Sequence, residues 1–242
     1  MAIIETYFLW FFFYSVIGWI YETILCSVAQ KRFINRGFFN GPYCPIYGFG
    51  ALLNILLLSE IKNLFLLFLA AFLLTTILEY VSSWGLEKLF HARWWDYSNK
   101  KVNLNGRVFL LGAIVFALLS LLQMKLLHPL IASYTAMIPE TIRSFGALCL
   151  FTLLLIDVVY TLTKLTELEH VLRDASLFLD NALHSVKTLL HEKVESRYHK
   201  INSQIRRMII SFPRLKSIHY NERLKMLKEL IKLKREKDKK DK

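Results

Sequence analysis

Charged residues and cysteines are scarce in this 242-residue sequence. Only 21% of its residues are charged and 55% are hydrophobic, a balance that is unusual for a soluble domain of this length. The three cysteines, Cys26, Cys44 and Cys149, are an odd number at scattered positions and fit neither a disulfide framework nor a C-x-x-C metal spacing. The composition therefore predicts a membrane protein with free thiols.

Several catalytic and targeting signals are absent as well. The sequence has no G-x-x-x-x-G-K-[ST] phosphate loop, so ATP hydrolysis by that route would need a separate subunit. It shows no H-E-x-x-H motif and no nucleophile–base arrangement, and we predict no enzyme, no metal and no cofactor. Residues 1–5 carry no Lys or Arg, and the apolar run that follows exceeds a signal-peptide core, so we expect the first helix to be retained.

The hydrophobic residues are concentrated in the first two thirds of the chain. Residues 1–164 are mostly long apolar runs, whereas residues 165–242 are polar and basic. We predict an all-α fold: a polytopic membrane protein with about five transmembrane helices in residues 1–164, followed by a cytoplasmic helical tail in residues 165–242. The apolar segments must be helical because lipid leaves backbone groups without partners. They cover residues 3–29, 44–58, 64–86, 108–127 and 141–164.

The second apolar segment is short. As a helix it reaches about 22 Å, against a hydrocarbon core of about 30 Å, so a re-entrant segment is the alternative to a crossing. If all five segments cross, Lys31, Arg32 and Arg36 share one side with the tail and with the basic loop before the fourth segment. The positive-inside rule then places the N-terminus outside and the C-terminus in the cytoplasm, and we favour five crossings.

Four ionisable residues lie within or beside the apolar segments: Glu22, Glu79, Arg107 and Asp157. A charge near the centre of a spanning helix costs about 2.5 to 3.5 kcal/mol, so such residues face the bundle interior and find partners. We predict an intramembrane polar cluster in which Arg107 pairs with Glu22 or Glu79. Two interpretations remain open: a substrate gate or proton site, and a structural set of ion pairs or snorkelling side chains.

The segment before the second apolar run combines glycines, prolines and aromatic residues. Glycine permits close backbone approach and proline fixes φ, so the segment has a defined shape. It is a candidate half-wound entry that lines a polar cavity, as broken helices do in transporters. A tight interfacial turn anchored by aromatic rings is the alternative. The candidate entry residues are Arg36, Gly37, Gly41, Pro42, Cys44, Pro45 and Gly48.

An aromatic loop follows the third apolar segment. Arg93, Trp94, Trp95 and Asp96 combine paired indole rings with two charges, which suits the lipid headgroup layer. We interpret these residues as an interfacial anchor. His91 and Asp96 are two candidate metal ligands, and two without a third do not predict a metal site.

The tail has a helical periodicity of its own. Apolar residues recur at alternating steps of four and three over residues 168–189 and again over 194–208, the spacing of a coiled-coil seam, which predicts either a helical hairpin or self-association into a homo-oligomer. Phe212-Pro213 ends this helix, and a last helix begins near Asn221. From residue 165 onward, 19 Lys and Arg face 11 Asp and Glu. We expect anionic lipid rather than nucleic acid as the tail's partner, since no groove-reading motif accompanies the charge.

Five motifs together resemble a family of bacterial membrane proteins. They are Gly18-Trp19-x-x-Glu22, the segment from Arg36-Gly37 to Gly48, Glu79 with Ser83-Trp84-x-Leu86-Glu87-Lys88, Arg93-Trp94-Trp95-Asp96-Tyr97-Ser98, and Asn105-Gly106-Arg107. The combination, over residues 5–160, is similar to the putative ABC-transporter type IV permeases. The resemblance implies a multi-pass protein of the bacterial cytoplasmic membrane that serves as a permease subunit.

Two functions follow from these observations. The resemblance, the shaped segment and the buried charges favour a permease subunit that relies on a separate ATP-binding subunit if transport is driven by ATP. The coiled tail favours a membrane scaffold or regulatory protein. The sequence does not indicate a substrate.

Overall fold

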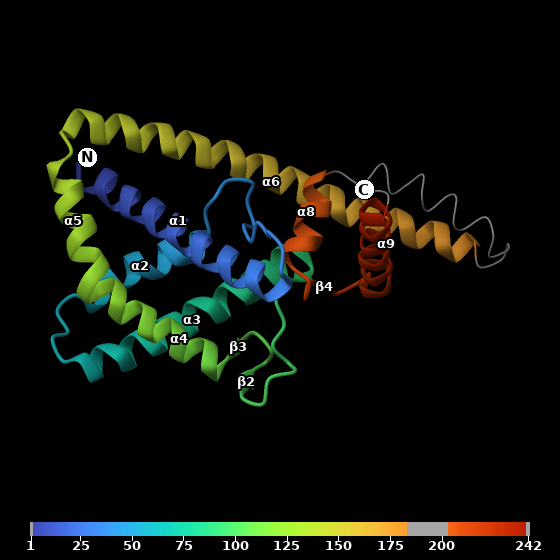
Figure 1. Cartoon of the computed structure of the whole chain (residues 1–242), viewed down its shortest axis with the longest axis horizontal. Coiled ribbons are helices and arrows are strands. Elements are labelled where there is room, and N and C mark those ends of the chain that lie inside the picture. Colours follow the sequence, from blue (N-terminus) through green and yellow to red (C-terminus); the bar gives the residue numbers. More distant parts are fainter. Residues whose placement is uncertain (1, 183–202, 241–242) are drawn as a thin grey trace. The chain divides into compact units, whose positions relative to one another are not determined.

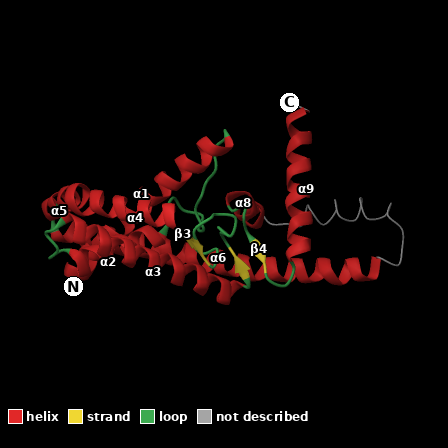
Figure 2. Cartoon of the chain, turned by 90° about the horizontal axis from the view of Figure 1, so that it is seen from below, coloured by secondary structure: helices red, strands yellow, loops and turns green. Residues whose placement is uncertain are grey.

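The computed structural model describes residues 2–182 and 203–240 (Figure 1). The chain divides into two compact units. Unit 1 comprises Met1–Gly85 and Asp96–Val158, and unit 2 comprises Leu86–Trp95 and Val159–Lys242. The described part of the chain is mainly helical with a few two-residue strands (Figure 2). Its elements are α1 (Ala2–Gln30), α2 (Pro45–Leu58), α3 (Leu64–Phe90), β1 (Ala92–Arg93), β2 (Asn103–Leu104), β3 (Val108–Phe109), α4 (Leu110–Leu122), the π-helix η1 (Gln123–Leu127), α5 (His128–Met137), α6 (Glu140–Ala182), α8 (Ser203–Ser211), β4 (Lys216–Ser217) and α9 (Asn221–Lys240).

Four stretches of the described chain are long and apolar enough to cross a membrane: Ile3–Gln30, Leu64–Phe90, Leu110–Met137 and Glu140–Leu165. They match the first, third, fourth and fifth predicted segments. The second predicted segment is α2, which is apolar but has only 14 residues. The structure therefore gives four helices of spanning length, and a fifth crossing depends on how α2 and the chain before it are arranged.

The fourth helical stretch is longer than predicted. We expected it to end at residue 127, before Pro129, but helix continues to Met137 through η1 and α5. Proline has no amide proton, so the regular ladder of hydrogen bonds cannot pass through Pro129 unchanged. The wider π-helical turn directly before α5 accommodates this defect and keeps the helix continuous.

Helix α2 packs antiparallel against α1 (Figure 1). The ring of Tyr47, near the start of α2, covers Gly18 so closely that a Cβ atom at residue 18 would overlap it. A Cβ atom at Gly48 would overlap the Ser15 hydroxyl and the Phe11 carbonyl in the same way. Small residues allow membrane helices to approach at this distance, so these two glycines fix the α1–α2 contact.

The chain between α1 and α2 returns along α1 without forming a helix. Near the end of α1, the Ile34 amide donates to the Ser27 hydroxyl at 2.9 Å. At the end of the segment, the Cys44 amide donates to the Ser15 carbonyl, in the middle of α1, at 2.8 Å. Pro45 is the first residue of α2, where its missing amide proton leaves no helical bond unmade. Residues 31–58 thus run back along α1, first as an irregular segment and then as a helix.

The other helices of unit 1 pack around this pair. Leu67 in α3 and Leu121 in α4 share an apolar cluster, while Arg107, just before α4, contacts Ser83 near the other end of α3, so α3 and α4 are antiparallel. At the start of α6, the Ser144 hydroxyl donates to the Glu5 carboxylate at 2.6 Å. These contacts place the beginnings of α1 and α6 together.

Unit 2 has a small apolar core. Strand β1 pairs antiparallel with β4. This pairing joins the chain that follows α3 to the chain between α8 and α9. Helix α8 ends at Ser211, before Phe212-Pro213, and α9 begins at Asn221, as predicted. The predicted seam runs through residues 183–202, which lie outside the described residues, so the coiled coil stays a prediction. The buried core side chains include Trp94, Met208, Phe212, Leu215, Leu224 and Ile231.

Candidate functional site

Unit 1 contains a cavity of about 200 Å³ between α1, α2, α3 and the α4–η1 helix. Its lining residues lie near the middle of three helices of spanning length. A helix that crosses a bilayer places its central residues near the midplane, so the cavity lies close to that depth. The lining residues are Tyr14, Ile17, Gly18, Tyr21, Ile46, Tyr47, Gly50, Ala51, Asn54, Thr75, Leu78, Glu79, Phe116, Leu119, Ser120, Leu122, Gln123 and Leu127.

Two buried amides form part of the cavity wall. Asn54 Nδ2 donates to Gln123 Oε1 at 2.9 Å, and Gln123 Nε2 donates to the Ala51 carbonyl at 3.3 Å. Gln123 is the first residue of η1, so the π-helical turn directs an amide side chain toward α2. Such turns are rare and occur frequently at functional sites.

Three oxygen atoms in this wall have no hydrogen-bond partner in the described part of the chain: the Tyr14 hydroxyl, which can donate or accept, and the acceptors Asn54 Oδ1 and Glu79 Oε2. Tyr14, Asn54 and Glu79 are 4%, 2% and 6% exposed, respectively. Buried polar atoms in native proteins are nearly always paired, and each exception indicates strain, a function or a bound species. All three atoms lie on residues that line the same cavity, which marks it as the candidate site of unit 1.

The structure places the four predicted cluster residues in three settings. Glu79 lines the cavity, and Glu22 lies close enough to interact with it electrostatically. Glu22 forms an ion pair with Arg36 at 3.5 Å and accepts a hydrogen bond from the Tyr47 hydroxyl at 2.8 Å. The partner of Glu22 thus comes from the predicted entry segment.

Asp157 has a separate environment. It accepts hydrogen bonds from the Asn40 amide at 3.1 Å, from Asn40 Nδ2 at 3.0 Å, from the Gly41 amide at 2.8 Å and from the Tyr43 hydroxyl. A carboxylate that binds several donors of one loop holds that loop in a single conformation. Asp157 therefore fixes the chain that leads through Pro42 into α2.

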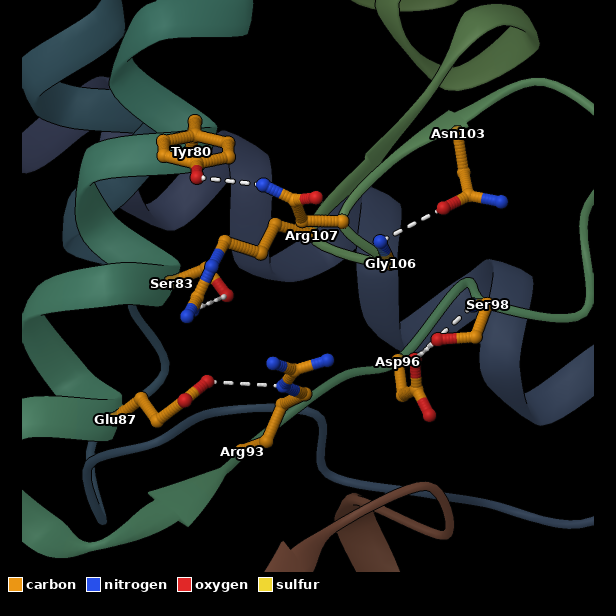
Figure 3. A network of polar contacts seen from close by, with 10 residues as sticks. Tyr80, Ser83, Glu87, Arg93, Asp96, Ser98, Asn103, Gly106 and Arg107 are labelled. Atoms are coloured by element: carbon orange, nitrogen blue, oxygen red, sulfur yellow. Dashed lines mark hydrogen bonds and ion pairs between the residues drawn. The ribbon is translucent and has the colours of Figure 1, made fainter.

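Arg107 lies at the junction of the β2–β3 hairpin and α4 and is 7% exposed. One guanidinium nitrogen donates to the Ser83 hydroxyl at 3.3 Å, and the guanidinium lies 5.6 Å from the centre of the Tyr80 ring (Figure 3). Asn105 Nδ2 donates to the Tyr80 hydroxyl at 3.0 Å. These contacts join the hairpin to α3, and the pairing of Arg107 with a glutamate stays a prediction.

Gly106 allows the hairpin to turn beside the loop that holds Asp96. Its φ is +67°, a value that residues other than glycine rarely adopt. A Cβ atom at this position would overlap the side chains of Asp96 and Ser98. Asp96 in turn accepts a hydrogen bond from the Ser98 amide at 3.0 Å (Figure 3). The Asn105-Gly106-Arg107 motif is therefore explained by backbone geometry and by its contacts to α3.

The predicted entry residues have individual roles in the irregular segment. Arg36 pairs with Glu22, Gly41 donates to Asp157, and Cys44 donates its amide to α1. The Gly37 amide donates to Asn35 Oδ1 at 3.1 Å, which stabilises a turn within the segment. These contacts attach the irregular segment to α1 and to Asp157, whereas none of the predicted entry residues is among those that line the cavity, so their role as an entry stays a prediction.

The predicted interfacial residues are found in both units. In unit 2, Arg93 forms an ion pair with Glu87 at 2.9 Å (Figure 3). Trp94 is 3% exposed, and its ring packs edge-on against Phe90 and Phe212. Trp94 is therefore a core residue of unit 2, and the anchoring interpretation stays a prediction for Trp95.

Sequence reasoning missed the uncharged residues of the cavity wall. Asn54 and Gln123 each stand alone in an otherwise apolar stretch, in Leu52-Leu53-Asn54-Ile55 and Leu121-Leu122-Gln123-Met124. A search for charged groups passes over them, although a lone amide in a lipid-facing helix also needs a partner. That pattern was the available signal for the site.

Comparison with known proteins identifies the family. The family model described as Putative ABC-transporter type IV matches residues 9–162, which include every residue that lines the cavity. No curated protein and no solved structure matches the chain. With its apolar helices of spanning length, the chain has the features of a multi-pass membrane transport component. The chain belongs to the putative ABC-transporter type IV family.

Proposed function

We propose that this chain is the membrane-spanning permease subunit of a transport system and that its solute passes through the cavity of unit 1. The observation that carries this proposal is a cavity among apolar helices, near the midplane, whose mostly apolar wall contains unpaired buried oxygens. Polar groups at this depth are costly and mark solute or ion pathways. A structural role would leave such atoms paired, as it does for Asp157.

The arrangement of residues 31–58 supports the same function. An irregular segment reaches the middle of α1, and α2 then begins there. Transporters bind solutes where discontinuous helices expose backbone groups near the midplane. We count this segment and α2 together as one crossing, which makes five and places the N-terminus outside and the C-terminus in the cytoplasm. Labelling of single cysteines at the two ends from one side of the membrane tests this topology, because both ends reacting from the same side would contradict it.

ATP hydrolysis is assigned to a separate subunit. The sequence has no phosphate loop, and the chain beyond the family match offers a helical, basic surface for a partner. Mild-detergent purification of the tagged chain from its native membrane is expected to retain an ATP-hydrolysing protein. Recovery of the chain without one, after cross-linking in intact cells, would contradict an ATP-driven mechanism.

Filling the cavity tests the proposed pathway. Asn54→Phe places a ring where the cavity lies, whereas Leu56→Phe enlarges an exposed residue on the opposite face of α2. Membrane vesicles that contain the chain and its partners are screened for uptake of radiolabelled small solutes. We expect the screen to identify a solute that wild-type vesicles take up. Its uptake should be lost with Asn54→Phe and kept with Leu56→Phe. Uptake that Asn54→Phe leaves unchanged would place the pathway elsewhere.

A further inference from the structure

The cavity wall offers hydrogen-bond acceptors that lack donors. Asn54 uses its amide nitrogen on Gln123, which leaves Asn54 Oδ1 unpaired, and Glu79 Oε2 is unpaired as well. Both are oxygen atoms on residues that are more than nine-tenths buried. With Glu79 ionised, a species that satisfies both acceptors donates hydrogen bonds to them.

The same wall contains one carboxyl group and no basic side chain among the described residues. Glu79 is the one acidic residue among the described residues that line the cavity, and this lining includes no Lys, Arg or His. Glu22 lies near Glu79 and increases the negative potential, although Arg36 offsets part of its charge. A carboxylate in a low-dielectric site is stabilised by a cation beside it, so the missing donor is best supplied by a positively charged group.

Aromatic side chains surround the remaining space. Tyr14, Tyr21, Tyr47 and Phe116 all line the cavity. The face of an aromatic ring attracts a cation, and several rings around one site are typical of ammonium-binding pockets. The rings also offer an apolar surface for the carbon atoms of a ligand, which a metal ion or a proton would not use.

The volume limits the size of the ligand. A cavity of about 200 Å³ corresponds to about seven water molecules at about 30 Å³ each. A small organic ion fits this volume.

We propose that the cavity binds a small primary amine in its protonated form, with the ammonium N–H groups donating to Glu79 and Asn54 and the carbon chain against the aromatic rings. This inference rests on the proposed function, because it names the solute class for the same cavity. A primary ammonium fits better than a quaternary one, because only N–H groups satisfy the unpaired oxygens.

Matched probes test the charge and the donors separately. The full-length protein, purified in detergent, is melted with n-butylammonium chloride, tetramethylammonium chloride, n-butanol or sodium butyrate at constant ionic strength. A ligand that binds only the folded state raises the melting temperature with concentration. We expect a saturable rise with butylammonium, a smaller rise with tetramethylammonium, and no saturable rise with butanol or butyrate.

Variants assign the binding to this cavity. Glu79→Gln removes the charge at nearly constant volume and is expected to weaken butylammonium binding at least tenfold. Glu60→Gln removes an exposed acid outside the cavity and is expected to leave binding unchanged. If Glu79→Gln does not fold, Asn54→Leu, which removes one acceptor, is measured by calorimetry and is expected to weaken binding severalfold.

The outcomes separate this inference from the proposed function. A saturable rise with butanol or butyrate that equals the rise with butylammonium, or no rise with any probe, overturns the amine assignment. Butylammonium binding that depends on Glu79, in a protein that moves no solute in vesicles, supports the amine site and removes the permease proposal. Uptake of an anionic solute that Asn54→Phe abolishes supports the permease proposal and overturns the amine site.

Discussion

Unit 1 and unit 2 use polar and apolar side chains in opposite ways. In the candidate membrane spans, only 17 to 28% of the residues in the most apolar window are buried, so most apolar side chains face outward. The buried positions of unit 1 include Ser15, Asn54, Glu79 and Gln123. In unit 2 the buried side chains are mostly apolar and the surface is basic, as in a water-soluble domain.

The two units therefore differ in which residues indicate how the chain is packed. In unit 1 an apolar residue does not indicate which face of its helix is packed, because lipid accepts apolar side chains on any face. A polar residue in a membrane helix is more informative, because it needs a specific partner. In unit 2 an apolar residue such as Phe212 reveals the core, because water does not accept a large exposed apolar surface. Substitutions in each unit test this difference, and the one with the largest expected effect is in unit 2.

Replacing a buried tryptophan in unit 2 should have the largest effect. Trp94→Ala removes a ring that packs against Phe90 and Phe212, and such truncations cost about 3 to 5 kcal/mol. Trp84 is 49% exposed, so Trp84→Ala serves as the control. Hydrogen exchange over residues 203–240 of the full-length protein should accelerate with the first variant only. Equal protection in both variants would contradict a core role for Trp94.

Enlarging a glycine at the α1–α2 contact should have the next largest effect. Gly48→Val forces a side chain into Ser15 and Phe11, and overpacking of this kind costs about 1 to 3 kcal/mol. Gly146 in α6 has open space around its Cβ position, so Gly146→Val controls for the change in residue type. Thermal unfolding in detergent should show a lower melting temperature for Gly48→Val alone. An unchanged temperature would mean that the helices are not in close contact.

The coupling between Asn54 and Gln123 should be smaller. Hydrogen bonds between membrane helices contribute about 0.6 kcal/mol on average and at most about 1.7 kcal/mol. Each leucine also changes the free energy of unfolding by itself, because it replaces a polar side chain with an apolar one. A double-mutant cycle with Asn54→Leu and Gln123→Leu separates the hydrogen-bond energy from these individual changes. We expect a favourable coupling in that range. Additive changes in the free energy of unfolding would show that the two amides act independently.

Lys228 gives the smallest predicted effect and depends on pH. Its ammonium donates to the Pro213 and Leu215 carbonyls at 2.8 and 2.6 Å, and burial, with Lys216 nearby, lowers its pKa below the usual 10.5. As pH rises from the folded pKa toward 10.5, the folded state releases its proton first, so the protein gains stability. The stability of the wild type relative to Lys228→Gln should therefore rise with pH in unfolding experiments. A flat or falling difference would contradict the burial of this ammonium.

Most of the helices could be predicted from the sequence, because an apolar run in lipid has one secondary structure available to it. The boundaries of α1, α2 and the start of α9 lie within a residue or two of the prediction. The extension of α4 through η1 to Met137 was missed, because the predicted apolar segment ended at residue 127 and a π-helical turn has no clear sequence signature.

The candidate site was predicted only in part. Glu79 was predicted, because a charge stands out in an apolar chain, whereas none of the predicted entry residues before α2 is among the residues that line the cavity. The different settings of Glu22, Asp157 and Arg107 depend on how the helices are rotated about their axes, and sequence position alone does not specify that rotation. Asn54 and Gln123 come together only because α2 lies antiparallel to α1 and beside η1.

The most direct test asks whether a small cation reaches the cavity. Cys26, Cys44 and Cys149 are replaced by Ala, and Ser120→Cys in the cavity wall is compared with Leu118→Cys on the outer face of α4. Each variant reacts with 2-aminoethyl methanethiosulfonate, which is cationic, and with the anionic 2-sulfonatoethyl reagent. We predict that residue 120 reacts at least tenfold faster with the cationic reagent and that residue 118 shows no such preference. A cysteine at residue 120 that is inert to both reagents, or equally reactive with both, would contradict a cavity that selects cations.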